Sequence, residues 1–333
     1  MLSQGPLSIA PLAPYLEDML DDPAWPFLVR FDDAVLSWEG WRKKLDVRVV
    51  GAKFLDRQGA ELISVPRMSI AFDGQALFAG QFRVIGLQLI EPRLRLLRHK
   101  DGGIEIANND GDAGGEARRG LSFDPGLFGG PGGDAGMSAF GDLRELSVLG
   151  ADLSFLDALS GLAFAVPSAD LCLRQEADGV SMRLSTRLRI GKSEAALGVS
   201  ALYREERAPI VAAMNFAEVD IAALAEIIGS EALIRLRGVS LIAAGRLDLM
   251  VSPEGVIDNL KFDVTTGPGQ VLLPELHGKA MPVAALAAKG EFVDNLSRMT
   301  LTDLRLDFDE DFVLRANGEW HRTTPGGMSL RGK

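Results

Sequence analysis

The sequence predicts a mainly β protein built on an antiparallel sheet, and three observations support this fold class. Apolar and polar residues alternate over 45–49, 67–72 and 93–96, so each segment has one aliphatic face and one polar or charged face. Residues that tolerate positive φ, such as Asp73-Gly74, separate these segments and suit the tight turns of a meander. The same alternation returns after residue 140, as it does in a sheet that grows by repeated strand-turn units.

The pattern divides the chain into five parts. Ser8 and the apolar stripe that follows it predict a helix over 8–21. The parts are an N-terminal helical segment (1–26), a first β-meander (27–106), a Gly-rich flexible insertion (107–140), a continued sheet with a short helix near 219–228 (141–322), and a polar Gly-rich tail at which the sheet stops (323–333).

A short motif occurs twice. Val50-Gly51-Ala52 is followed by Val65-Pro66, and Leu149-Gly150-Ala151 is followed by Val166-Pro167. Each copy then enters an aliphatic strand, where a proline near the strand start is tolerated. The repetition predicts two equivalent strand-turn units on either side of the Gly-rich insertion.

Composition excludes several classes of protein. The chain has 333 residues, 47% of them hydrophobic, which is enough to bury a substantial core. A formal net charge of −11 argues against nucleic-acid binding, which needs clustered lysine and arginine. The single cysteine, Cys172, allows neither a disulfide nor a cysteine metal site within one chain. No apolar run of about 18 residues and no signal-peptide pattern is present.

The sequence contains no constellation of catalytic or metal-ligating residues. The three histidines, His99, His277 and His321, are far apart and lack metal-ligand spacing. Residues 191–193 end like a phosphate-binding loop but lack its upstream glycine, and residues 108–119 imitate a calcium loop without its bidentate glutamate. We therefore expect a protein that is not an enzyme and uses no metal or cofactor.

Several stretches together resemble the N-terminal region of bacterial AsmA-like proteins, the YhdP group of bridge-like lipid transfer proteins in particular. They are L-S-I-A-P-L-A-P-Y-L-E-D at 7–18, V-R-F-D-D-A-V-L-S-W-E-G-W at 29–41, V-G-A at 50–52 and P-R-L-R-L-L-R-H-K-D-G-G at 92–103. The resemblance covers most of the chain. It rests on strand and turn patterns that are specific in combination and carry no catalytic signature.

The resemblance implies an elongated, curved, taco-like β-groove that carries phospholipid acyl chains through the periplasm, between the inner and the outer membrane. In that family a transmembrane helix comes directly before a stretch like Leu7–Asp18. We therefore expect this chain to be the soluble part of a longer periplasmic protein that is anchored to the inner membrane. The implied partners are phospholipids, the inner membrane and outer-membrane components.

The inward aliphatic residues of the predicted strands are the candidates for contact with acyl chains, and no single one is privileged. They are Leu45, Val47, Val49, Met68, Ile70, Phe72, Leu94, Leu96, Leu184, Leu188, Leu304 and Leu306. A low aromatic content of 7% suits such a greasy, adaptable surface.

Alternation alone leaves two architectures open, because a closed β-sandwich and an open groove both remove one face of a sheet from water. The resemblance favours the groove. The alternative is a β-sandwich that serves as a scaffold or assembly factor for outer-membrane biogenesis and binds no lipid. A hydrolase is disfavoured, because no nucleophile constellation is present.

Overall fold

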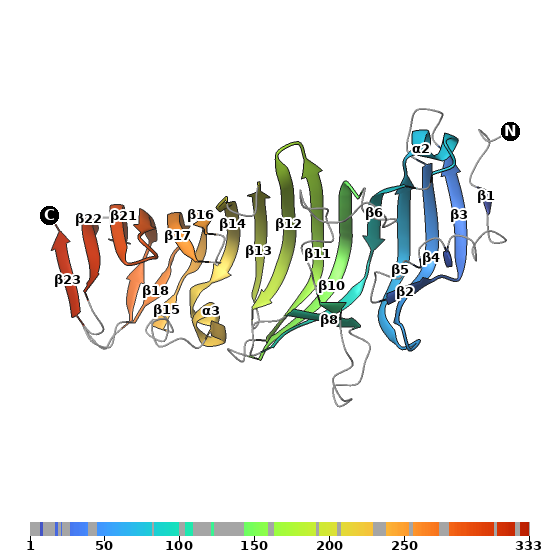
Figure 1. Cartoon of the computed structure of the whole chain (residues 1–333). Coiled ribbons are helices and arrows are strands. Elements are labelled where there is room, and N and C mark those ends of the chain that lie inside the picture. The colour runs from blue at the N-terminus through green and yellow to red at the C-terminus, as the bar shows by residue number, and fades with distance from the viewer. Residues whose placement is uncertain are drawn as a thin grey trace. The chain divides into compact units, whose positions relative to one another are not determined.

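The chain is mainly β, which confirms the predicted fold class (Figure 1). The structure is a computed structural model. It describes residues 7–8, 17–18, 21, 27–38, 45–81, 83–99, 104–108, 121–122, 143–158, 163–190, 193–204, 208–228, 238–252, 256–272, 280–309, 312–323 and 327–332. Most of the predicted helix over 8–21 and most of the insertion over 107–140 lie outside the described residues. Where they are described, the predictions are corrected in part: Ser8 pairs with Val35 as strand instead of capping a helix, and the end of β8 (Ile104–Asn108) and all of β9 (Leu121–Ser122) fall within the predicted insertion. The chain forms two compact units, Met1–Glu176 and Ala177–Lys333.

The first unit is a sheet centred on two long strands. Its elements are β1 (Leu7–Ser8), β2 (Phe27–Arg30), β3 (Asp33–Trp38), β4 (Leu45–Asp56), β5 (Glu61–Phe72), α2 (Gly74–Phe78), β6 (Val84–Ile90), β7 (Arg93–Arg98), β8 (Ile104–Asn108), β9 (Leu121–Ser122), β10 (Glu145–Asp157) and β11 (Ala163–Glu176). Strands β2 and β3 both pair with one edge of β4, and β5 pairs with the other edge. The sheet then continues through β6 to β10 and β11.

One junction of this sheet is parallel, which the prediction of a wholly antiparallel sheet did not include. Strands β6 and β7 both lie parallel to β10, whereas β10 and β11 are antiparallel. Parallel neighbours need a connection of a dozen residues or more, and the segment between β7 and β10 is long enough to supply one. The fold is therefore a mixed sheet, with antiparallel pairing at its other described junctions.

The repeated motif marks two equivalent places in the first unit. Gly51 and Gly150 both have positive φ, at 65° and 63°. The carbonyl before each glycine accepts a hydrogen bond from the residue at which the neighbouring strand is interrupted: Asp32 N–H donates to Val50 O at 3.0 Å, and Glu91 N–H to Leu149 O at 2.7 Å. The sequence repeat is thus confirmed as a structural one.

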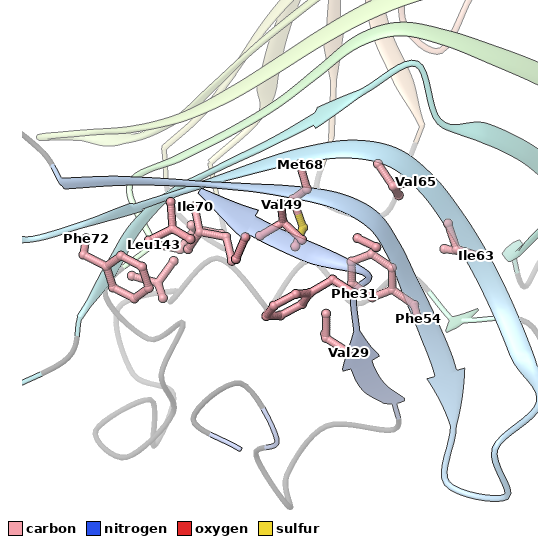
Figure 2. Close-up of a cluster of buried hydrophobic side chains, with 14 of the residues drawn as sticks. Val29, Phe31, Val49, Phe54, Ile63, Val65, Met68, Ile70, Phe72 and Leu143 are labelled. Carbon is pink, nitrogen blue, oxygen red and sulfur yellow. The ribbon is translucent and has the colours of Figure 1, made fainter. Parts of the chain in front are cut away.

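A closed hydrophobic core lies against one face of β4 and β5. Figure 2 shows Val29 and Phe31 facing Val49 and Phe54, with Leu143 beside the other end of the cluster. Val29 belongs to β2, which pairs with β4, Phe31 follows β2, and Leu143 comes just before β10. The result is nearly complete burial, with Val49 at 1% exposure.

The second unit is a row of antiparallel strands. They are β12 (Gly179–Ile190), β13 (Ser193–Tyr203), β14 (Ile210–Asp220), β16 (Ile242–Val251), β17 (Ile257–Thr266), β20 (Ala285–Val293), β21 (Arg298–Asp309), β22 (Phe312–Thr323) and β23 (Gly327–Gly332). The predicted short helix is confirmed as α3 (Ile221–Ile228), which begins where the Asp220 carboxylate accepts a hydrogen bond from Ala223 N–H at 3.1 Å. A small second sheet contains β15 (Val239–Ser240), β18 (Gly269–Val271) and β19 (Met281–Val283).

The prediction that the sheet stops in the tail after residue 322 is wrong. Strand β22 continues to Thr323, and β23 pairs with it antiparallel from Gly327 onwards. The glycines at 326 and 327 suggested an unstructured end, but they follow Pro325 and equally suit a turn. Beyond them Met328 and Leu330 alternate with polar residues, which is a strand pattern.

Candidate functional site

Cross-strand pairing in the second unit gathers apolar residues on one face of its sheet. Residues that lie opposite each other in neighbouring strands point to the same side. Leu184 lies opposite Val199, Val199 opposite Met214, and the row continues strand by strand to β22. We call this surface the apolar face. Its three rows are Thr186, Leu197, Phe216, Gly245, Val264, Ala288, Leu304 and Ala316; Leu184, Val199, Met214, Leu247, Phe262, Gly290, Leu301 and Gly318; and Met182, Ala201, Ala212, Leu249, Leu260, Phe292, Met299 and Trp320.

The apolar face is only half-buried. Of its three rows, only Thr186, at 8% exposure, is fully buried. The equivalent face in the first unit behaves differently, since Val47 and Val49 are 2% and 1% exposed beneath their covering residues. Within the described part of the second unit, therefore, these three rows are not buried as the core of the first unit is.

One end of the apolar face is closed. Helix α3 and the small sheet lie beside the same ends of the second-unit strands, the lower ends in Figure 1. Leu241 and Val283, at 1% and 2% exposure, form a buried cluster there and pack against Leu306 and Phe308. Ala195 on β13 and Ala243 on β16 are also buried. We call this the closed end, and it includes Leu188, which lies opposite Ala195.

The other side of the same sheet is charged. Arg246 Nη2 lies 2.6 Å from Asp248 Oδ1 within β16, and Lys289 Nζ lies 2.8 Å from Asp263 Oδ2 between neighbouring strands. The hydrogen bonds from Arg246 hold the pKa of Asp248 below its usual range, and the bond to Asp263 raises the pKa of Lys289. These exposed ion pairs keep one side of the sheet wet while the other stays apolar.

Loss of the Arg246–Asp248 pair is expected to have a small, pH-dependent effect. The folded pKa of Asp248 is lowered, so the pair contributes stability above the ordinary aspartate pKa of about 4, and that stability is lost as pH falls through the folded value. Asp248→Asn should therefore be slightly less stable than the parent at pH 7 in urea titrations, and the difference should shrink as the pH falls through the folded pKa of Asp248. Because the Asp248 side chain is 47% exposed, the difference at pH 7 should shrink in 1 M salt.

Two phenylalanine rings of the apolar face lie across glycines of the next strand. Phe216 lies opposite Gly245, and Phe262 lies opposite Gly290. A methyl group added at Gly290 would lie 2.7 Å from Phe262 Cζ, and one added at Gly245 would lie 3.1 Å from Phe216 Cζ. Each ring therefore packs close against the backbone of the neighbouring strand and does not project from the apolar face at these positions.

Substitution of these glycines should destabilise the second unit. A methyl group in Gly290→Ala would meet both the Phe262 ring and the Thr300 carbonyl oxygen, so a loss of about 2 kcal/mol in unfolding free energy is expected. Gly198 is the matched control, because a methyl group there meets no heavy atom within 4 Å. Gly198→Ala should gain about 0.5 kcal/mol by restricting the unfolded chain. Urea titrations check both values, and equal effects would contradict the packing described.

The structure divides the twelve candidate residues between the two units. In the first unit Val47, Val49, Met68, Ile70 and Phe72 belong to the closed core. Leu45, Leu94 and Leu96 are half-buried there, and the first two pack against that core.

In the second unit Leu184, Leu188, Leu304 and Leu306 all lie on the apolar side of one sheet. Leu184 and Leu304 belong to the half-buried rows, and Leu188 and Leu306 lie at the closed end. Sequence reasoning missed most of this surface, including Val199, Met214 and Leu247. The pairing register of the strands connects them to the prediction, since each of these residues lies in the same row as Leu184, which was predicted.

No family model matches the sequence, and neither a curated protein nor a solved structure matches it. The resemblance to the AsmA-like proteins therefore stays a prediction. The function has to be inferred from the apolar face itself.

Two further features bear on the chemistry. Among the described residues, no group of three or more His, Cys, Asp or Glu side chains is placed to hold a metal ion. Of the helices that the structure describes, none is both long and apolar enough to cross a bilayer. His99 and His321 lie among the described residues, and His277 lies outside them.

Proposed function

We propose that the second unit is a non-catalytic lipid-transfer segment whose apolar face holds phospholipid acyl chains. The observation that carries this proposal is the row-by-row continuity of a half-exposed apolar surface across the strands from β12 to β22. A contiguous apolar surface of this kind, bordered by charge, is typical of a binding site.

The energetics favour alkyl chains as the ligand. Each methylene group removed from water contributes about 0.8 kcal/mol, so a chain of some sixteen carbons needs no specific polar contact. Apart from Thr186 and Trp320, the rows consist of Leu, Val, Met, Phe, Ala and Gly, whose side chains carry no hydrogen-bonding group. A chain held in this way can slide along the rows, because no single residue anchors it.

The dimensions support more than one lipid at a time. Eight strands at the usual spacing of about 4.8 Å give the apolar face a width of roughly 34 Å. The resemblance to the AsmA-like proteins supports the remaining parts of the proposal: a periplasmic location, anchorage in the inner membrane, and movement of lipid between the inner and the outer membrane.

The test is native mass spectrometry with lipid extraction on the chain purified from a Gram-negative host. Co-purifying phospholipids, released on denaturation, are the expected result. A folded chain that carries no lipid and takes none from labelled phospholipid vesicles would contradict the proposal. It would favour the alternative function, a scaffold or assembly factor for outer-membrane biogenesis.

A further inference from the structure

We infer that a bound phospholipid lies along the strands of the second unit, with its acyl chain ends at the closed end and its head group at the opposite, turn-bearing rim. The inference rests on the proposed function. It adds an orientation and a polar subsite, which neither the alternation of the sequence nor the continuity of the apolar face specifies.

The closed end is mainly apolar, and the hydroxyl of Thr266, which lies there opposite Ala243, already accepts a hydrogen bond from Leu286 N–H at 3.2 Å. Leu241, Val283 and Ala243 are at most 4% exposed there, and Leu306 and Phe308 pack against the cluster. A phosphate or ammonium group placed against these side chains would lose its hydration without gaining a partner, which is strongly unfavourable. Acyl chain ends meet no such penalty.

The opposite ends of the same strands carry short turns with paired charges. Arg204, just after β13, lies 3.0 Å from Asp178, just before β12. Arg298, at the start of β21, lies 3.1 Å from Asp294, just after β20. The antiparallel order places both pairs at one end of the sheet, which we call the rim. All four side chains are well exposed, so both charge signs are available to a zwitterionic head group.

The distance between rim and closed end fits one acyl chain. Met182, in the row nearest the rim, and Leu188, at the closed end, are six residues apart on β12. At about 3.3 Å per strand residue, this separation is roughly 20 Å. The chains of one bilayer leaflet occupy about 15 Å, half of the roughly 30 Å hydrocarbon core. A chain that lies along the strand therefore reaches the closed end while its head group stays at the rim.

Depth-dependent quenching tests this orientation. Cys172→Ser removes the single native thiol, and Met182→Cys or Leu188→Cys then places a thiol-linked fluorophore at the rim or the closed end. The full chain is loaded with phosphatidylcholine that carries a nitroxide on the head group, on carbon 5 or on carbon 16. The quenching of the fluorophore is then compared between the three lipids. Arg187→Cys, on the charged side of the same strand, is the matched control. Leu306→Cys replaces Leu188→Cys if that variant does not fold.

The expected result is opposite quenching profiles: the rim probe quenched most by the head-group label, the closed-end probe most by the carbon-16 label, and the control by neither. Equal profiles at both positions, or the reverse order, would overturn the inferred orientation and leave the proposed function standing. Absence of quenching at either position, together with absence of bound lipid, would overturn the proposed function and this inference with it.

Discussion

Val49→Asp is expected to unfold the first unit, whereas Val50→Asp, one residue away on the same strand, is expected to leave it folded. Val49 is 1% exposed within the closed core, and Val50 is 47% exposed on the opposite side of β4. A carboxylate at Val49 would be buried without a partner, which costs more than about 4 kcal/mol in unfolding free energy. A carboxylate at Val50 stays in water.

Hydrogen exchange of the full chain measures this difference segment by segment. Amides of β4 and β5 should lose protection in Val49→Asp and keep it in Val50→Asp, while the strands of the second unit serve as an internal reference. A milder variant, Val49→Ala, should remain folded and lose about 2–3 kcal/mol. If Val49→Asp kept native protection, Val49 would have to line an accessible surface instead of a core.

Local alternation predicted strands in both units but could not predict which apolar side is covered. Val47 and Val49 alternate with polar neighbours much as Leu184 and Leu188 do. Yet the first pair is buried and the second pair is half-buried. The difference arises from residues distant in sequence, such as Phe31 and Leu143, which pack beneath β4 and β5. The alternation within one strand is set by its local sequence, whereas the burial of a face depends on residues from elsewhere in the fold.

Two other features escaped prediction for identifiable reasons. Strands β13 and β14 are rich in alanine, which has a low strand propensity and blurs the apolar alternation of Leu197, Val199 and Met214. The parallel pairing of β10 with β6 and β7 joins segments that are separated by the Gly-rich insertion, and reading from turn to turn assumes neighbours. The repeat at Gly51 and Gly150 was predictable, because a backbone position with positive φ favours glycine, and both glycines are visible in the sequence.

The double variant Leu184→Asp with Leu304→Asp is expected to abolish lipid loading without unfolding the second unit. Both leucines are half-buried in the rows of the apolar face, on strands near its two sides, so their carboxylates can reach water. An alkyl chain laid over them would have to cover two charges. Each charge placed in hydrocarbon costs about 2.5–3.5 kcal/mol, so loading should fall by well over tenfold.

The matched control adds the same two charges to the other side of the sheet. Ser185 and Ser200 are exposed on the charged side of β12 and β13, where Ser185→Asp with Ser200→Asp should leave loading unchanged. Lipid per protein, measured by extraction after incubation with labelled phospholipid vesicles, compares the two double variants, and circular dichroism confirms that both are folded. Equal loading of the two folded variants would mean that the apolar face does not hold the lipid. The continuous apolar rows would then have a role other than binding lipid.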